Sequence, residues 1–199
     1  TDEYEIVIVN DCSNDNTLNK LHKLNIKNLS LYNHDKNLGQ SKAIQTGILN
    51  SKYNYIITID GDGQNDPADI LKILDIFMSN NNLKLISGVR KKRMDKFSKI
   101  LASKIANKIR SLILNDHCPD TGCSLKFFDK NIFLNFPFFN GIHRFIPSLF
   151  EGYGFEVKYF SVNHRKREYG NSKYNNINRL FRGIKDLFHV RSILKGKNK

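Results

Sequence analysis

Apolar residues are grouped along the chain in two kinds of segment. Short apolar runs, which predict buried strands, lie at residues 4–9, 29–32, 55–59 and 83–87. Apolar residues at helical spacing, which predict helices, lie at residues 14–24, 39–49, 67–77 and 97–114. Because strands and helices alternate, the pattern predicts an α/β fold with a mostly parallel central sheet flanked by helices. Ligands of such a sheet bind at the carboxyl ends of its strands.

The second half of the chain changes character. Strands are predicted at residues 124–128 and 156–162. Residues 133–150 are aromatic and interrupted by prolines, which predicts loops and short helices along a pocket wall. A terminal amphipathic helix is predicted over residues 176–195, with apolar side chains at Ile177, Leu180, Phe181, Ile184, Leu187 and Phe188. The 199 residues, 40% of them apolar, predict a single domain.

Charge and cysteine content narrow the choice of partners and compartment. The chain has 32 Lys and Arg against 19 Asp and Glu, a net charge of +13, which predicts an anionic partner. Nucleic acid, lipid headgroups and a phosphorylated substrate all fit this charge. Three cysteines fit the reducing cytoplasm better than a disulfide framework. The apolar runs are far shorter than the roughly 20 residues of a membrane-crossing helix, so we expect peripheral membrane attachment at most.

The strongest chemical signal is the turn Asp60-Gly61-Asp62-Gly63-Gln64, directly after an apolar strand. Two carboxylates two residues apart can face one divalent cation, and the glycines let the backbone approach a diphosphate. An acidic turn that only ends the strand is the alternative. A calcium loop fits less well, because no acidic residue closes it and Pro67 interrupts the pattern.

A second acidic turn, at residues 10–15, follows the first strand. Two such turns at the carboxyl ends of parallel strands would face one crevice, which predicts a nucleotide site. Helix capping by Ser13 or Asp15 is compatible with this role. A zinc site at Cys118 and Cys123 is disfavoured, because their spacing lacks a second matching pair, and buried cysteines are expected instead.

Five motifs in order resemble family 2 glycosyltransferases of Rossmann-like GT-A fold. Three of them, at residues 9–17, 37–47 and 60–67, carry the general resemblance. The other two, at residues 120–123 and 163–174, are similar to the branch that includes dolichyl-phosphate mannose synthase and bacterial polyprenyl-phosphate enzymes. The family usually begins with a further strand, so we expect this sequence to start after that strand.

The resemblance implies where each ligand binds. The nucleotide-sugar donor would contact Asn10, Asp11, Lys42, Asp60 and Asp62. Mg²⁺ or Mn²⁺ on the donor diphosphate would be held by Asp60, Asp62 and Gln64. The acceptor phosphate would be held by Arg90, Arg93, Arg167, Ser172 and Lys173. Catalysis would depend on Asp62, Arg90, Arg167 and Lys173. Asn10 stands where the family commonly has a carboxylate, so Asp11 is the better candidate for the nucleobase.

The resemblance implies an inverting, metal-dependent enzyme that moves a hexose-type sugar from a UDP- or GDP-sugar to a polyprenyl phosphate such as undecaprenyl or dolichyl phosphate. Residues 1–128 would bind the nucleotide sugar, residues 129–175 would form the acceptor side, and residues 176–195 would form the amphipathic helix. We expect the enzyme at the cytoplasmic face of the membrane. A homo-oligomer is compatible with the sequence.

Three alternatives remain. A family 2 enzyme acting on a hydroxyl acceptor would need a general base, whereas a lipid phosphate is already an anionic nucleophile. A nucleic-acid-binding module would explain the charge, but no binding motif is found and the aromatic residues lie in apolar contexts. We therefore expect no nucleic-acid partner. A truncated, inactive nucleotide-binding domain is the third alternative, against which the two acidic turns weigh.

Overall fold

The computed structural model describes residues 3–91, 97–166 and 176–197. In its first half, strands and helices alternate as predicted: β1 Ile6–Asn10, α1 Thr17–His22, β2 Leu29–Asn33, α2 Gln40–Asn50, β3 Tyr55–Thr58, α3 Ala68–Met78, β4 Leu83–Arg90 and α4 Phe97–Leu114. The second half contains β5 Lys126–Asp129, α5 Lys130–Leu134, a 3-10 turn at Ile142–Arg144, α6 Ile146–Gly152, β6 Glu156–Val162 and α7 Asn176–Gly196. The predicted order of elements is confirmed.

The first helix begins later than the pattern predicts. The expected start was near residue 14, but α1 begins at Thr17. The Asp15 carboxylate accepts a hydrogen bond from the Thr17 N–H at 3.0 Å, so this side chain satisfies a backbone donor at the start of the helix. The short polar residues before Thr17 therefore belong to the turn that follows β1.

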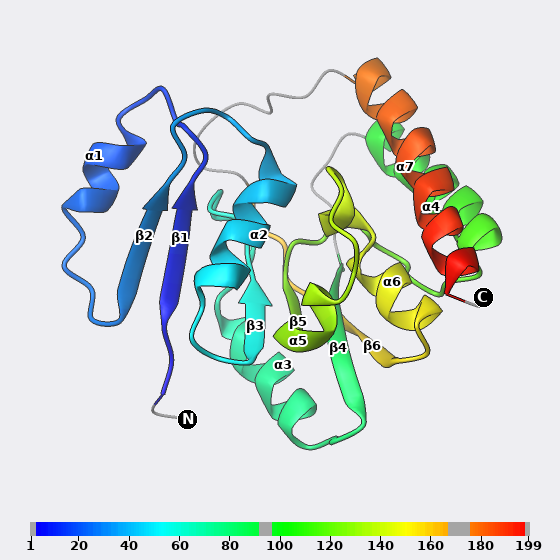
Figure 1. Cartoon of the computed structure of the whole chain (residues 1–199), viewed down its shortest axis with the longest axis horizontal. Helices are drawn as coiled ribbons and strands as arrows, with labels where there is room; N and C mark the ends of the chain where they lie inside the picture. The colour runs from blue at the N-terminus through cyan, green and yellow to red at the C-terminus, as the bar shows by residue number, and fades with distance from the viewer. Residues whose placement is uncertain (1–2, 92–96, 167–175, 198–199) are drawn as a thin grey trace.

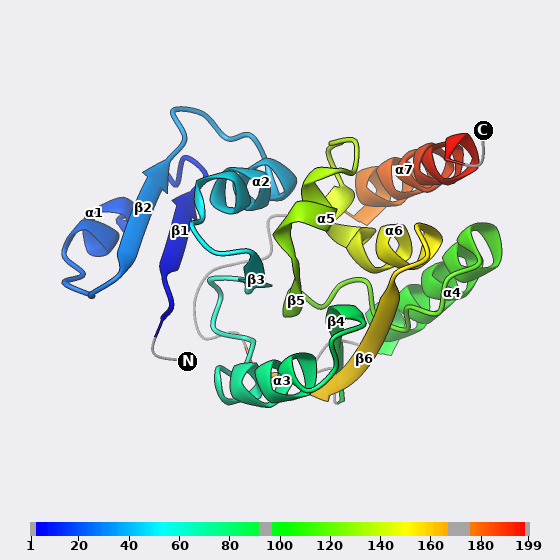
Figure 2. The ribbon, with the colours of Figure 1, turned by 60° about the horizontal axis from the view of Figure 1, so that its bottom comes forward.

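The strands of the described residues form two hydrogen-bonded sheets. β1 and β2 pair in parallel, and the second sheet has the order β3-β5-β4-β6. β5 runs antiparallel to both β3 and β4, whereas β4 and β6 are parallel. Two of these four strand pairings are parallel and two, both made by β5, are antiparallel, so the expectation of a mostly parallel sheet is wrong for the sheet that contains β5. Figures 1 and 2 show β1 and β3 as neighbouring strands, and α2 lies against them.

Alternating side chains of the second sheet fill two apolar clusters on its opposite faces. Leu85 and Phe128 point into a cluster shared with α6 and α7, whereas Ile86 and Phe127 point into a cluster shared with α3. This alternation is the period of two that a β-strand imposes. Figure 2 shows α3 on one side of the sheet and α6 on the other. Both faces are thus covered, as the continuous apolar strands predict.

The direction of β5 decides which loops meet at the site edge. Thr58 near the end of β3 pairs with Lys126 at the start of β5, and Ser87 of β4 pairs with the same residue. Because β5 is antiparallel, the residues that precede it lie at the edge where β3, β4 and β6 end. This edge holds the candidate site.

Candidate functional site

The acidic turn after β3 lies at this edge and is held at both ends. The Asp60 N–H donates to the Ser124 hydroxyl at 3.2 Å, and the Asn65 side-chain amide donates to the same oxygen at 2.8 Å. Within the turn, the Gln64 N–H donates to the Asp62 carboxylate at 3.1 Å. Gly63 has a φ of 74°, a conformation that favours glycine. The turn is therefore a folded structure rather than an open loop.

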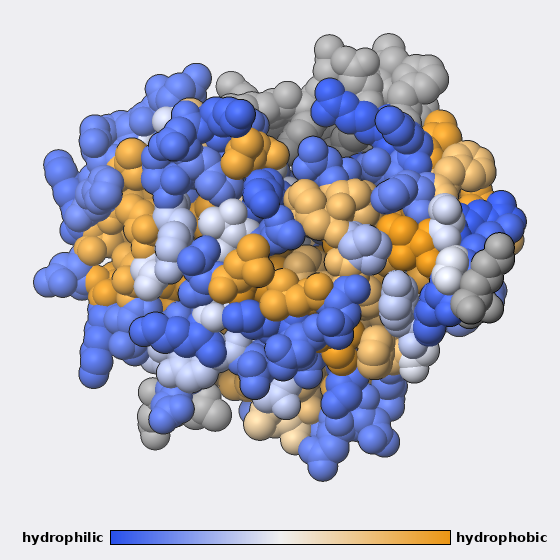
Figure 3. All heavy atoms as spheres, in the orientation of Figure 1, coloured by the Kyte–Doolittle hydropathy of each residue, from blue (hydrophilic) through white to orange (hydrophobic). Residues whose placement is uncertain are grey.

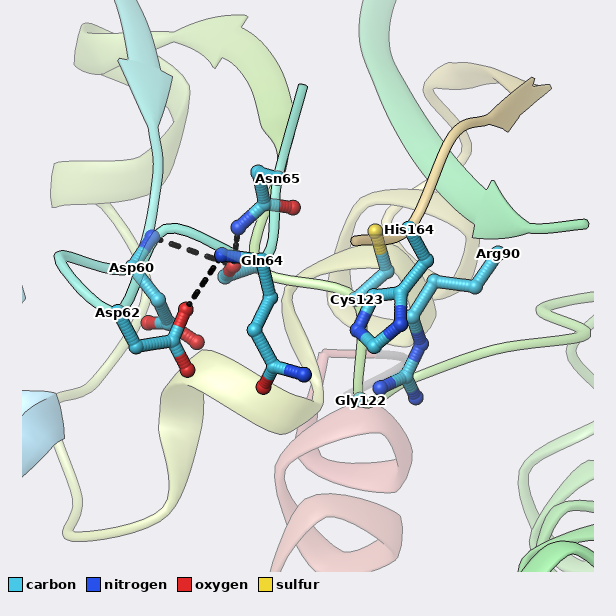
Figure 4. Close-up of a pocket in the computed structure, with 9 residues that line it drawn as sticks. Asp60, Asp62, Gln64, Asn65, Arg90, Gly122, Cys123 and His164 are labelled. Atoms are coloured by element: carbon cyan, nitrogen blue, oxygen red, sulfur yellow. Dashed lines mark hydrogen bonds between the residues drawn. The ribbon is translucent and has the colours of Figure 1, made fainter. Parts of the chain in front are cut away.

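A polar pocket opens beside this turn. Its lining comes from four separate segments of the chain: Asp60, Asp62, Gln64, Asn65, Arg90, Gly122, Cys123, Ser124 and His164. Figure 4 shows Asp60, Asp62 and Gln64 on one side of the pocket and Arg90 with His164 on the other. Of the predicted site residues, the structure thus brings together the three expected metal ligands and the first expected phosphate-binding arginine.

Burial raises the pKa of the Asp60 carboxyl above its ordinary value, and the neighbouring charge of Asp62 raises it further. Hydrogen bonds from Ser124 and Gln40 and the charge of Lys126 act in the opposite direction. Two carboxylates this close repel each other, and a divalent cation would relieve that repulsion. Carboxylate and amide oxygens are the hard ligands that Mg²⁺ and Mn²⁺ prefer, so the donor set fits.

No group of three or more His, Cys, Asp or Glu side chains that could hold a metal occurs within residues 3–91, 97–166 and 176–197. The acidic turn instead offers two carboxylates and one amide. Mg²⁺ is commonly bound by one or two carboxylates together with substrate phosphates. The structure therefore fits a cation that the protein and a diphosphate ligand hold jointly.

Arg90 is aimed into the pocket by a two-pronged ion pair. Its guanidinium donates to both carboxylate oxygens of Asp120, each at 2.7 Å. The same carboxylate accepts the Arg90 N–H at 3.3 Å and the Gly122 N–H at 3.2 Å. Paired hydrogen bonds of this kind fix the plane of a guanidinium and not only its distance. Asp120, which had no assigned role, therefore positions a predicted phosphate-binding group.

Asp11, the expected nucleobase contact, organises the loop before α2. Its carboxylate bonds to the His34 ring at 2.8 Å and accepts the N–H groups of Leu38 and Gly39, each at 2.8 Å. Burial acts to raise the pKa of Asp11, but the hydrogen bonds from His34, Leu38 and Gly39 outweigh it and lower the pKa. Asp11 is therefore held as an ionised side chain.

The two acidic turns are connected through Gly39 and Gln40, at the start of α2. Asp11 accepts the Gly39 N–H, and the next side chain, Gln40, donates to the Asp60 carboxylate at 2.8 Å. Adjacent residues thus contact both turns, although β1 and β3 belong to different sheets. Asp11 does not itself line the pocket beside Asp60, so the convergence of the two turns on one crevice stays a prediction.

Two predicted donor-binding side chains are engaged elsewhere. Asn10 is buried; its amide donates to Asn33 at 2.6 Å, and its oxygen accepts the Ser13 N–H at 3.3 Å. Lys42 donates to Gln45 at 2.8 Å and lies over the Phe138 ring. Neither residue lines the pocket described above. Four further predicted residues lie outside the described residues: Arg93, Arg167, Ser172 and Lys173.

The structure adds His164 and Ser124 to the pocket. His164 pairs with Asn65 in an antiparallel bridge, and the Arg165 N–H donates to the Gln64 carbonyl at 2.8 Å. His164 lies within a motif that the sequence had highlighted, so its position could have suggested a role. Ser124 carried no such signal, because it only marked the start of an expected strand.

The predicted burial of Cys118 and Cys123 is confirmed. Burial raises the pKa of the Cys118 thiol to about 11, and burial also raises the pKa of the Cys123 thiol. Both side chains therefore stay protonated at neutral pH. A protonated thiol is a poor metal ligand, which agrees with the expected structural role of these residues.

Comparison with known proteins places the chain in a family. Residues 1–136 match the family described as Glycosyl transferase family 2. The chain belongs to this family. It is 34% identical over 200 residues to the dodecaprenyl-phosphate galacturonate synthase of Rhizobium johnstonii. That match covers 98% of the chain and 59% of the relative, so the chain spans about three fifths of this relative's length. The predicted family is confirmed.

Solved structures confirm the predicted fold. The glucosyl-3-phosphoglycerate synthase of Mycobacterium tuberculosis, in complex with Mn²⁺, UDP and phosphoglyceric acid, matches with a TM-score of 0.70 and 11% identity over 96% of this chain and 67% of that one. The mannosyl-3-phosphoglycerate synthase of Rubrobacter xylanophilus matches with a TM-score of 0.68 and 12% identity over 98% and 65%. The chain therefore has the GT-A fold of these enzymes. None of its described helices is long and apolar enough to cross a membrane.

Proposed function

We propose that this chain is the catalytic domain of an inverting glycosyltransferase that moves a sugar from a nucleotide diphosphate sugar to a polyprenyl phosphate. The observation that carries the proposal is the pocket, in which two carboxylates and an amide face an arginine across a narrow polar space. Opposite charges on its two walls suit a cation-bound diphosphate on one side and a phosphate on the other. The name of the Rhizobium relative supports a polyprenyl phosphate acceptor.

The donor side of the pocket would be formed by the acidic turn. Asp60, Asp62 and Gln64 would hold Mg²⁺ or Mn²⁺ against the diphosphate, with Asp11 at the nucleobase end. The cation supplies charge stabilisation for the departing nucleotide diphosphate. The Mycobacterium neighbour binds Mn²⁺ and UDP, which supports this assignment. The transferred sugar is either a neutral hexose or a uronic acid, because the Rhizobium relative is named for galacturonate.

The acceptor side would be formed by Arg90, held in place by Asp120. A guanidinium fixed by paired hydrogen bonds is suited to bind a phosphate in one orientation. The acceptor phosphate is ionised near neutral pH, so its oxygen attacks the anomeric carbon without a general base. Direct displacement inverts the configuration at that carbon. We assign further contacts with the acceptor phosphate to Arg93, Arg167, Ser172 and Lys173.

The helix α7 would contact the membrane surface. Ile184 and Phe188 on this helix are exposed to 45% and 54%, and Arg182 and Lys185 are exposed beside them. Figure 3 shows apolar atoms next to hydrophilic ones along this part of the surface. Exposed apolar and basic side chains on one helix suit docking on anionic headgroups. Such docking would bring the pocket to a lipid acceptor at the cytoplasmic face.

The test uses purified protein, undecaprenyl phosphate in vesicles, and labelled UDP-glucose, UDP-galacturonic acid or GDP-mannose, with Mg²⁺, Mn²⁺ or EDTA. We expect label in the organic phase with one donor, lost on addition of EDTA and lost when undecaprenol replaces its phosphate. Transfer to undecaprenol, or to a soluble sugar acceptor in its place, would favour the hydroxyl-acceptor alternative and contradict the proposal.

A further inference from the structure

Both ends of the acidic turn are fixed to one side chain outside it. Ser124 precedes β5, and its hydroxyl oxygen accepts the Asp60 N–H at 3.2 Å and the Asn65 amide at 2.8 Å. A hydroxyl oxygen has two acceptor positions, so these two bonds fill both. A single atom thus joins Asp60, the first residue of the turn that would hold the cation, to Asn65, the residue that directly follows the turn.

Other contacts of this junction secure Ser124 without using its hydroxyl. The Thr58 hydroxyl donates to the Ser124 backbone carbonyl at 2.7 Å, which joins the end of β3 to the residues before β5. On the far side of the turn, the Arg165 N–H donates to the Gln64 carbonyl at 2.8 Å. The backbone of the junction and the hydroxyl of Ser124 can therefore be tested separately.

The distance between the two carboxylates of the turn depends on how its backbone is folded. Asp60 and Asp62 are two residues apart, and a metal ligand must be held within a few tenths of an ångström of its place. If the Ser124 hydroxyl is removed, the Asp60 N–H and the Asn65 amide lose their common acceptor, and the backbone on the two sides of the turn loses this link.

We propose that Ser124 is a positioning residue that sets the geometry of Asp60 and Asp62 for cation binding. This inference rests on the metal site of the proposed function, which it deepens by naming the group that shapes that site. Ser124 itself would not bind the cation. Its role would be to reduce the number of conformations that the turn can adopt before the cation arrives.

The test measures binding of Mn²⁺ alone, by the loss of the electron paramagnetic resonance signal of free Mn²⁺. We expect Ser124→Ala to weaken Mn²⁺ binding about fivefold to tenfold, the effect of a lost hydrogen bond or two. Ser124→Thr keeps the hydroxyl and should bind within about twofold of wild type. Thr58→Val is the matched control, because it removes the neighbouring bond to the Ser124 carbonyl and leaves the hydroxyl in place.

Wild-type affinity in Ser124→Ala would overturn the inference, and so would an equal loss in Thr58→Val, which would assign the effect to the strand junction. Thermal unfolding without metal checks that each variant is folded. Sugar transfer is measured separately, in the assay that tests the proposed function. A wild-type protein that binds Mn²⁺ but transfers no sugar in that assay would contradict the proposed function and leave the role of Ser124 standing.

Discussion

At the scale of single residues, Asp62 is a proposed ligand of the cation, and its negative charge also repels the neighbouring Asp60 carboxylate. Its charge opposes ionisation of the buried Asp60 carboxyl. We expect Asp62→Asn to lower kcat/KM for sugar transfer by about 10²-fold or more, because the site loses a charged ligand of the cation. The same variant should melt no lower than wild type without metal, since one of two repelling charges is gone. Transfer assays and thermal unfolding check both parts, and a large loss of stability would contradict this account.

Arg90 is the residue whose shape, and not only its charge, should matter. Arg90→Lys keeps the charge but cannot form the paired hydrogen bonds with Asp120. We expect the KM for undecaprenyl phosphate to rise about tenfold while Mn²⁺ binding stays unchanged. Arg165→Lys is the control, because Arg165 is 56% exposed and pairs with Asp66 outside the pocket. A rise of KM in both variants would argue against a specific role for Arg90.

The acidic turn stood out in the sequence because it directly follows an apolar strand, whereas Arg90 was suggested by the resemblance to the family. The sequence did not predict that the Asn10 side-chain amide donates to the Asn33 side-chain oxygen inside the protein. It also could not identify Ser124, since the partners of this hydroxyl lie 64 and 59 positions away. Contacts over such separations depend on strand pairing, which the local pattern of residues does not contain.

At the scale of elements, the direction of β5 is the main feature that the sequence left open. Its residues Phe127 and Phe128 are both buried, one on each face of the sheet. A strand covered on both faces shows a continuous apolar run, and this run is the same for either direction. The element was therefore predicted, while its antiparallel pairing with β3 and β4 was not.

A buried charge network fixes α4 to α6 and to the loop that leads to Asp120. Arg110 donates to Asp116 at 2.8 Å and also to the carbonyl of Cys118, and Asp116 accepts the Ser148 hydroxyl. We expect Arg110→Met to lower the free energy of unfolding by about 3–5 kcal/mol, because it leaves Asp116 buried and unpaired. Denaturant titration measures this loss.

The double variant Arg110→Met with Asp116→Asn serves as the control for the charge network. It removes both charges, so it should recover part of the stability that the single variant loses. If the double variant is no more stable than Arg110→Met alone, the cost comes from lost packing of the arginine rather than from an unpaired carboxylate.

The exposed face of α7 makes a prediction about lipid surfaces. Phe188→Glu should weaken binding to vesicles of phosphatidylglycerol about 30-fold or more, because it removes about 2 kcal/mol of apolar burial and adds a repelled charge. Leu71→Glu on α3 is the matched control: Leu71 is 66% exposed on the other side of the sheet. Sedimentation with vesicles measures both variants. An equal loss of vesicle binding in both variants would show that the net charge of the protein, and not the apolar face of α7, attracts it to the vesicles.

At the scale of the whole molecule, the alternation of strands and helices predicted the α/β architecture, and the motifs predicted the family. The division of the strands into two hydrogen-bonded sheets was not predicted. The pattern shows that β1 and β3 are apolar, but hydrogen bonding between neighbouring strands also needs a spacing of about 4.8 Å, which no local sequence pattern specifies. Hydrogen bonds of Gly39 and Gln40 nevertheless connect the loops that follow β1 and β3.

The division into two sheets has a consequence for handling this protein in solution. Within the described residues, β2 pairs only with β1 and lies on the outer side of that strand, away from β3, so it presents a row of backbone groups that another strand can join. Unprotected strand edges of this kind promote self-association. We expect light scattering to rise steeply with protein concentration, and Ser30→Lys, which places a charge on the partly exposed Ser30 of β2, to suppress that rise. Scattering that stays independent of concentration in wild type would show that this edge is already protected.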